Sequence, residues 1–170
     1  LVIGDGQKET TTIGPLIDSN AAEDVKSLIE DAKIKGARVE LGGDSCDLGD
    51  NFINPTILSN INTSMRVFNE EIFGPVAPII KFETENEAIE LANQTDFGLA
   101  AYFYSRDIGR VYRVSEKLEF GIIGVNEGII SNEMAPFGGI KESGNGREGS
   151  KYGLDDYLEI KYVCVGGINE

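Results

Sequence analysis

Apolar and polar positions follow two periods along this chain, and these periods predict helices and strands in turn. Apolar residues recur at the spacing of amphipathic helices in three segments, residues 19–35, 85–92 and 108–118. Apolar runs or residue-by-residue alternation, both typical of strands, are found at residues 38–41, 56–58, 76–82, 99–104, 120–126 and 158–164. Strands that alternate with helices predict an α/β fold with a largely parallel sheet flanked by helices.

Capping residues mark the ends of two of these helices. Asp18 or Ser19 can cap the first helix, and Gly36 can end it. Thr84 and Glu87 have the spacing of a capping box at the start of the second helix. Stretches rich in glycine or polar residues predict loops at residues 1–18, 44–55 and 136–149.

Composition and charge narrow the classes of function. The chain has 170 residues, which suffices for one domain or for a large part of a bigger one. Its formal net charge of -14 at pH 7 argues against binding to nucleic acid or to an anionic membrane surface, because both need clustered Lys and Arg. No apolar run reaches the length of about 18 residues that is needed to span a membrane. A small anionic ligand stays possible, since one local cationic pocket can exist in an acidic protein.

Missing residue types exclude several kinds of catalytic site. The sequence contains no histidine, so it cannot build a Ser-His-Asp triad, a Cys-His dyad or a histidine-ligated zinc site. Cys46 and Cys164 are too few for an all-cysteine zinc site or a disulfide framework. We therefore assign no metal site and expect the thiols to belong in a reducing compartment, the cytoplasm.

Two segments are candidate ligand sites. Glu70 and Glu71 precede Phe73 and a Gly-Pro turn; a carboxylate can accept two hydrogen bonds from the vicinal diol of a ribose, and a nearby aromatic ring can pack against a flat ligand. The alternative is a solvated acidic turn with Phe73 in the core. Ser131 follows an apolar strand, where ligands commonly meet α/β folds, and its hydroxyl could donate to a carboxylate. The alternative is a local serine turn.

The segment 144–149 has the letter pattern G-x-G-x-x-G of a dinucleotide-binding loop. Such a loop must follow a strand and open a helix, with an acidic residue further along the chain. Here a loop precedes the pattern and the chain ends soon afterwards, so we interpret the segment as a turn that needs glycine. The start of the chain, residues 1–6, lacks an initiator Met and a basic flank, which predicts an internal or C-terminal piece of a longer protein.

Together these segments resemble the aldehyde dehydrogenase superfamily. The sequences EEIFGPV at 70–76 and PFGGIKESG at 136–144 are similar to its two C-terminal signatures, and the likeness covers nearly the whole chain. Similarity to the succinate-semialdehyde dehydrogenase branch in particular lies at residues 128–133, 146–153 and 157–162.

The resemblance implies roles for four residues. Glu71 would bind the hydroxyls of the nicotinamide ribose of NAD or NADP, and Phe73 would contact the nicotinamide end of that cofactor. Ser131 would help to hold the distal carboxylate of the substrate, and Phe137 would line the aldehyde tunnel. The nucleophilic Cys, the oxyanion Asn and the general-base Glu of the family lie upstream of the matched segment. We therefore assign no catalytic residue to this chain and expect it to be inactive alone.

The resemblance also implies an organisation and an activity. Residues 1–156 would be the C-terminal part of the catalytic domain, and residues 157–170 a terminal strand that joins subunits into a homo-oligomer. The whole enzyme would oxidise succinate semialdehyde to succinate with NAD or NADP, through a thiolate that attacks the aldehyde carbon. Two alternatives stay open: another aldehyde dehydrogenase, such as a glutarate-semialdehyde dehydrogenase, or a catalytically silent fragment that associates through its last strand.

Overall fold

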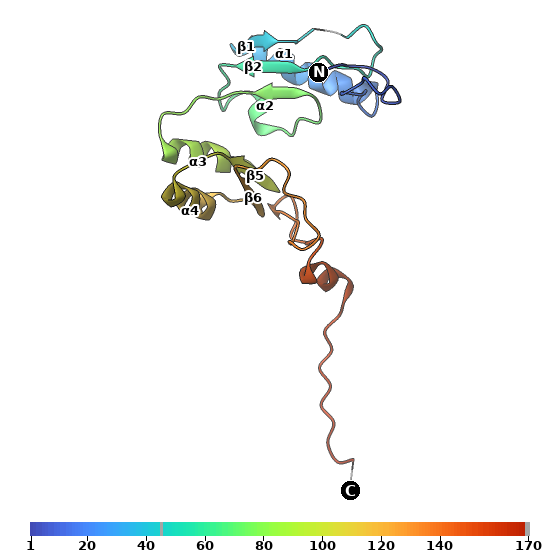
Figure 1. The fold of residues 1–170 in the computed structure, drawn as a ribbon, viewed down its shortest axis with the longest axis vertical. Coiled ribbons are helices and arrows are strands. Elements are labelled where there is room, and N and C mark those ends of the chain that lie inside the picture. Colours follow the sequence, from blue (N-terminus) through green and yellow to red (C-terminus); the bar gives the residue numbers. More distant parts are fainter. Residues whose placement is uncertain (45, 169–170) are drawn as a thin grey trace. The chain divides into compact units, whose positions relative to one another are not determined.

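A computed structural model describes residues 1–44 and 46–168 of the chain. Its helices and strands confirm the α/β class (Figure 1). The contacts within the chain divide it into two compact units, Leu1–Phe82 and Glu83–Glu170.

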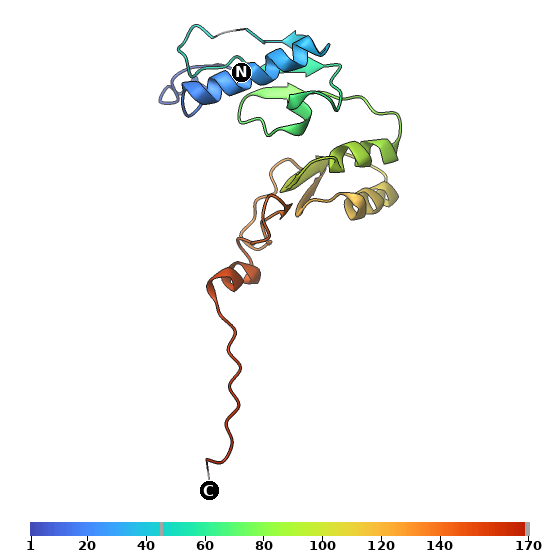
Figure 2. The ribbon, with the colours of Figure 1, turned by 180° about the vertical axis from the view of Figure 1, so that it is seen from behind.

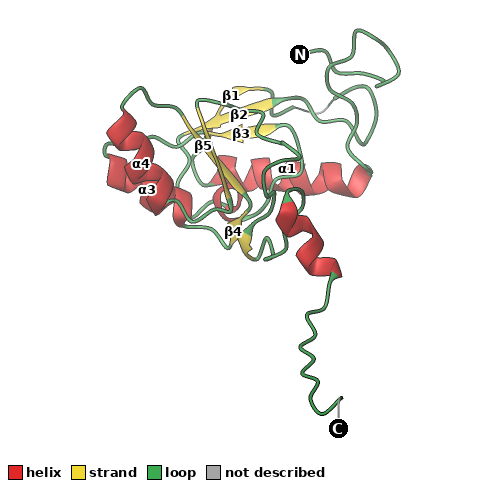
Figure 3. Cartoon of the chain, turned by 60° about the horizontal axis from the view of Figure 1, so that its bottom comes forward, coloured by secondary structure: helices red, strands yellow, loops and turns green. Residues whose placement is uncertain are grey.

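The Leu1–Phe82 unit is a small sheet covered on one face by a helix. Its strands pair in the order β1-β2-β3, with β1 antiparallel to β2 and β2 parallel to β3. Figure 3 shows helix α1 running along this sheet. In chain order the elements of the unit are α1 (Ser19–Ile34), β1 (Arg38–Leu41), β2 (Thr56–Ser59), α2 (Arg66–Asn69) and β3 (Val76–Pro78).

The core of this unit is built mainly by α1. Five α1 side chains spaced three or four residues apart are buried together with side chains of β2 and α2: Ala22, Val25, Leu28, Ile29 and Ala32. Each large apolar side chain buried in this way stabilises the fold by about 1.5–3 kcal/mol. The expected caps are present, since Asp18 accepts a hydrogen bond from the Ala21 amide at 2.8 Å and Gly36 has a φ of +99°.

The Glu83–Glu170 unit contains two short two-stranded sheets. Strand β5 pairs in parallel with β6, and β4 pairs antiparallel with β7. Helices α3 and α4 lie side by side next to β5 and β6 (Figure 2). In chain order its elements are α3 (Glu85–Asn93), β4 (Phe97–Gly98), β5 (Ala100–Phe103), α4 (Ile108–Lys117), β6 (Ile122–Val125), β7 (Ile140–Lys141) and a 3-10 helix (Lys151–Tyr157).

The pairing of the strands is mixed rather than largely parallel. A parallel pair needs a crossover connection, which α4 supplies between β5 and β6. Strands β1 and β2 are joined by a loop instead, and they pair antiparallel. The predicted strand 76–82 is also shorter, because pairing stops at Pro78, and Ile79 and Phe82 are exposed.

Residues 158–166 are extended, and residues 158–168 are exposed (Figure 1). In the part of the chain that the structure describes, they pair with no other strand. The expected strand therefore has no partner within the chain, and its role between subunits stays a prediction, as does the division at residue 156. Residues 169–170 of the expected terminal strand lie outside the described residues. No described helix is both long enough and apolar enough to cross a membrane.

Candidate functional site

Glu71 and Phe73 lie on the extended segment that follows α2. The chain leaves the helix at Glu70, whose φ and ψ are -105° and 147°. Successive side chains of an extended segment point to opposite sides. Ile72 packs against the core of the unit, whereas Glu71 is exposed and Phe73 is 75% exposed. The carboxylate and the aromatic ring are therefore presented on the same side.

The two adjacent carboxylates of this segment differ in their contacts. Glu70 is paired with Arg66, which donates from Nε at 2.6 Å and from Nη2 at 2.8 Å. Hydrogen bonding from this guanidinium holds the pKa of Glu70 below its usual value. Among the described residues, Glu71 makes no hydrogen bond or ion pair. Its oxygens are free to accept from a ligand, and the exposure of Phe73 excludes the alternative of a core residue.

Ser131 and Phe137 line one pocket of about 390 Å³ in the Glu83–Glu170 unit. The Ser131 side chain is exposed, and in the described part of the chain its hydroxyl has no hydrogen-bond partner. The alternative of a local serine turn is therefore not found. Phe137 is half-buried and is fixed through its backbone, which exchanges two hydrogen bonds with Glu148 at 2.8 and 2.7 Å.

Carboxylates dominate the electrostatics of this pocket. Glu133 and Glu148 both line it, together with the neutral residues Ser131 and Asn132. Neither carboxylate forms an ion pair within the described residues. A hydroxyl donor could hold an anionic group here only if positive charge came from outside the residues that line the pocket.

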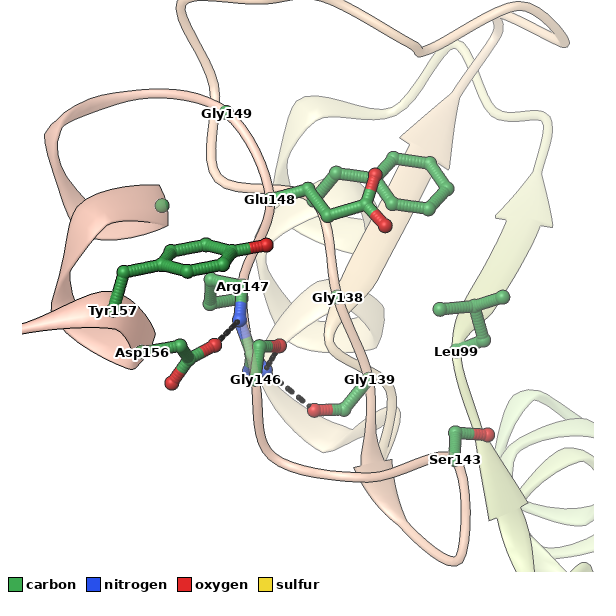
Figure 4. Close-up of a pocket in the computed structure, with 12 residues that line it drawn as sticks. Leu99, Gly138, Gly139, Ser143, Gly146, Arg147, Glu148, Gly149, Asp156 and Tyr157 are labelled. Carbon is green, nitrogen blue, oxygen red and sulfur yellow. Dashed lines mark hydrogen bonds between the residues drawn. The ribbon is translucent and has the colours of Figure 1, made fainter.

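A neighbouring pocket of about 650 Å³ shows how the loop that carries Phe137 is held (Figure 4). Nη1 of Arg147 donates to the carbonyl oxygens of Gly139, Asn145 and Gly146 at 2.6, 3.0 and 2.9 Å. The backbone N–H of Arg147 donates to Asp156 at 3.3 Å. One guanidinium thus joins the backbone at Gly139, just before β7, to the segment 145–147.

Sequence reasoning missed Arg147, although a signal for it exists. The close spacing of glycines between 138 and 149 indicates backbone that approaches other backbone. At Gly138 a Cβ would collide with the carbonyl oxygen of Gly146, so only glycine fits there. Gly144 and Gly149 have φ of +86° and +65°, which supports the interpretation of 144–149 as a turn.

The four predicted site residues fall into two pairs. Glu71 and Phe73 belong to the Leu1–Phe82 unit, and Ser131 and Phe137 belong to the Glu83–Glu170 unit. The structure brings the members of each pair together, and the role of each residue stays a prediction. Both cysteines are free, with Cys46 half-buried and Cys164 exposed. Within the described ranges, no group of three or more Cys, Asp or Glu side chains is arranged to hold a metal ion.

Comparisons with known proteins give one consistent result. The sequence profile described as "Aldehyde dehydrogenase family" matches residues 1–163. A curated 3-sulfolactaldehyde dehydrogenase of Pseudomonas putida is 57% identical over 169 residues, which are 99% of this chain and 35% of that protein. The succinate-semialdehyde dehydrogenase [NADP(+)] GabD of Escherichia coli K12 is 59% identical over 166 residues, 98% of this chain and 34% of that protein.

A solved structure agrees with these relatives. The crystal structure of succinate-semialdehyde dehydrogenase from Burkholderia pseudomallei has a TM-score of 0.94 and 55% identity, and the match covers 97% of this chain and 34% of that one. The chain therefore spans about a third of the length of the relatives that it matches.

Proposed function

Because the chain belongs to the aldehyde dehydrogenase family, we propose that it forms part of an enzyme that oxidises succinate semialdehyde to succinate with NAD or NADP. The observation that carries this proposal is its 59% identity to the succinate-semialdehyde dehydrogenase of E. coli, over nearly its whole length. In this proposal the nucleophile and the general base belong to parts of the enzyme outside the 170 residues. A cytoplasmic location and assembly into a homo-oligomer through residues 158–165 belong to the same proposal.

The first contribution of this segment is cofactor placement. Glu71 is exposed and has no partner among the described residues, so its carboxylate can accept two hydrogen bonds from the ribose diol. Phe73 offers an exposed ring on the same side for the nicotinamide end. When bound, the nicotinamide supplies the hydride acceptor. A misplacement of about 1 Å at a reacting centre can cost on the order of 10²-fold in rate, so one carboxylate that orients the ribose matters for turnover.

The second contribution is recognition of the substrate. Ser131 would donate its hydroxyl hydrogen to the distal carboxylate, and Phe137 would pack against the aliphatic part of the aldehyde. Because Glu133 and Glu148 line the same pocket, this role requires cations from the rest of the enzyme, as the family resemblance implies.

A second candidate substrate is 3-sulfolactaldehyde, which the 57% identity to the P. putida enzyme favours. Both substrates carry an aldehyde at one end and an anionic group at the other. Another anionic aldehyde, glutarate semialdehyde, fits the same chemistry. The ratio of kcat/KM among the three substrates selects the physiological one.

The test is Ser131→Ala in the complete enzyme. A hydrogen bond to a charged group is worth about 1.5–3 kcal/mol, so we expect KM for succinate semialdehyde to rise by about tenfold or more. KM for an uncharged aldehyde of the same length, which serves as the control, should change much less. Ser131→Thr keeps the hydroxyl and should retain most of the affinity. Equal effects on both aldehydes would remove the carboxylate-binding role of Ser131.

A further inference from the structure

An ion-pair network in the Leu1–Phe82 unit ends one residue before Glu71. Arg66 is the first residue of α2, and its Nε and Nη2 donate to the two oxygens of Glu70. When a planar guanidinium donates two parallel hydrogen bonds to a planar carboxylate, the orientation of the carboxylate is fixed as well as its distance from the guanidinium. The hydrogen bonds lower the pKa of Glu70 and raise the pKa of Arg66, so both groups are charged at neutral pH.

The same arginine is also tied to α1. Its Nη1 donates to Oγ of Ser27 at 2.8 Å, and its backbone N–H donates to Oδ2 of Asp31 at 2.9 Å. Asp31 is held in turn by Lys35 at 2.8 Å. Helix α2 has only four residues and no side-chain N-cap of its own, so α1 provides the acceptor that its first turn otherwise lacks.

The chain beyond Glu70 is anchored at two more points. Ile72 packs against the core, and Gly74 lies so close to α1 that a Cβ there would come within 2.7 Å of Cγ2 of Val25. Residues 70, 72 and 74 are thus held, while Glu71 and Phe73 alternate with them and are exposed. The anchor at residue 70 is a side-chain ion pair, and it lies next to Glu71, the carboxylate proposed to bind the cofactor.

We propose that Arg66 is a positioning residue, which through Glu70 and Ser27 fixes the direction of the Glu71 carboxylate and thereby strengthens cofactor binding. This inference rests on the proposed function, which gives Glu71 its contact with the nicotinamide ribose. Arg66 and Ser27 themselves touch no ligand in this scheme. Their contribution is to hold the extended segment against α1 before the cofactor binds, so that binding loses less conformational entropy.

The test is Arg66→Gln in the complete enzyme, with the dissociation constant of the oxidised cofactor measured by titration calorimetry. This change keeps the backbone N–H that donates to Asp31, so α2 retains its link to α1. An exposed ion pair contributes little, so we expect the dissociation constant to rise only by about two- to fivefold. KM for the cofactor should rise with it and kcat should fall, because the ribose is oriented less well, whereas KM for the aldehyde should stay nearly unchanged.

Two further variants serve as controls. Arg66→Lys keeps the charge but loses the two-bond geometry, so an intermediate loss of affinity is expected. Lys33→Gln breaks an exposed ion pair between Lys33 and Glu30 of α1, in which Nζ and Oε2 are 2.7 Å apart and α2 takes no part. It should leave cofactor binding unchanged.

The outcomes separate this inference from the proposed function. If Glu71→Gln weakens cofactor binding and Arg66→Gln does not, the positioning role is wrong and the cofactor contact stands. If Glu71→Gln itself has no effect, the cofactor contact in the proposed function is wrong. Should Arg66→Gln fail to fold, Glu70→Gln decides, because it leaves the contacts of Arg66 with Ser27 and Asp31 intact. Unchanged cofactor binding in Glu70→Gln would then overturn the inference.

Discussion

Single arginine side chains hold the backbone segments that carry the candidate site residues. Arg66 binds the carboxylate next to Glu71, and Arg147 binds three carbonyl oxygens around the loop of Phe137. In both cases the residue proposed to meet a ligand is left without a side-chain partner in the described part of the chain, while a neighbour along the chain is fixed. Such an arrangement orders the site without using the hydrogen bonds that the ligand needs.

Arg147→Ala should destabilise the Glu83–Glu170 unit. The substitution removes hydrogen bonds to three carbonyl groups, and Gly139 among them is buried. We expect the free energy of unfolding to fall by about 1–3 kcal/mol. All six tyrosines of the chain belong to this unit, so urea denaturation followed by tyrosine fluorescence reports on it.

The matched control for this prediction is Lys151→Ala. Lys151 is an exposed cation in the same unit, 5.0 Å from the centre of the Tyr152 ring. Its replacement should change the free energy of unfolding by less than about 0.5 kcal/mol. Equal midpoints for both variants and the unaltered chain would show that the Arg147 contacts do not stabilise the unit.

The candidate ligand residues could be proposed from the sequence, and their roles stay predictions, whereas the arginines that hold their segments were not proposed from it. Adjacent carboxylates before an aromatic residue form a local pattern, and so does a serine that follows an apolar strand. Arg66 contacts Ser27, which is 39 positions away, and Arg147 contacts backbone carbonyls, for which the glycine spacing indicates close backbone approach but names no side chain. Pairing of that kind depends on the folded path of the chain.

At the scale of elements, helices were predicted better than strands. The capping residues Asp18 and Thr84 begin α1 and α3 as expected, because a cap is a local hydrogen bond within one turn. Strand lengths and directions depend on partners elsewhere in the sequence. The run 76–82 therefore predicted seven residues of strand, of which three pair with β2.

Helices α3 and α4 are joined by one carboxylate, which should make the stability of their unit depend on pH. Glu85 of α3 accepts hydrogen bonds from Arg110 and Arg113 of α4 at 2.9 to 3.1 Å. Side-chain hydrogen bonds from Arg113 and then Arg110 lower the pKa of Glu85 from 4.5 to about 2. The unfolded chain then binds this proton more readily than the folded chain, so the stabilisation is complete above pH 4.5 and is lost as pH falls toward 2.

Glu85→Gln should therefore reduce the loss of stability between pH 4.5 and 2. The measurement is the free energy of unfolding at several pH values, again followed by tyrosine fluorescence. Asp107, whose pKa is also lowered, contributes to the same decline, so the slope should become smaller without vanishing. Glu116→Gln on α4 is the control, because Glu116 forms no ion pair within the described residues. Identical pH profiles for Glu85→Gln and the unaltered chain would contradict the assignment.

At the scale of the whole molecule, the segment 158–168 exposes more apolar surface than a free chain end needs. Ile160 is 100% exposed, and Tyr162, Val163 and Val165 are exposed as well. An extended segment with unpaired backbone groups and apolar side chains is a template for pairing with another chain. The sequence predicted a strand here, and among the described residues no other strand pairs with it, so a partner in another chain stays a prediction.

We therefore expect the 170-residue chain to associate with itself. Because the proposed nucleophile and general base lie outside it, we also expect the chain alone to show no dehydrogenase turnover. Its mass by light scattering should increase with concentration above the 18.4 kDa of one chain. Tyr162→Lys should reduce this association, because a lysine on an edge strand opposes pairing. Ile129→Lys is the control, since Ile129 is an equally exposed apolar residue in a loop. Strictly monomeric behaviour of the unaltered chain at high concentration would argue against pairing through this segment. Turnover by the chain alone would show that its nucleophile and base lie within the 170 residues.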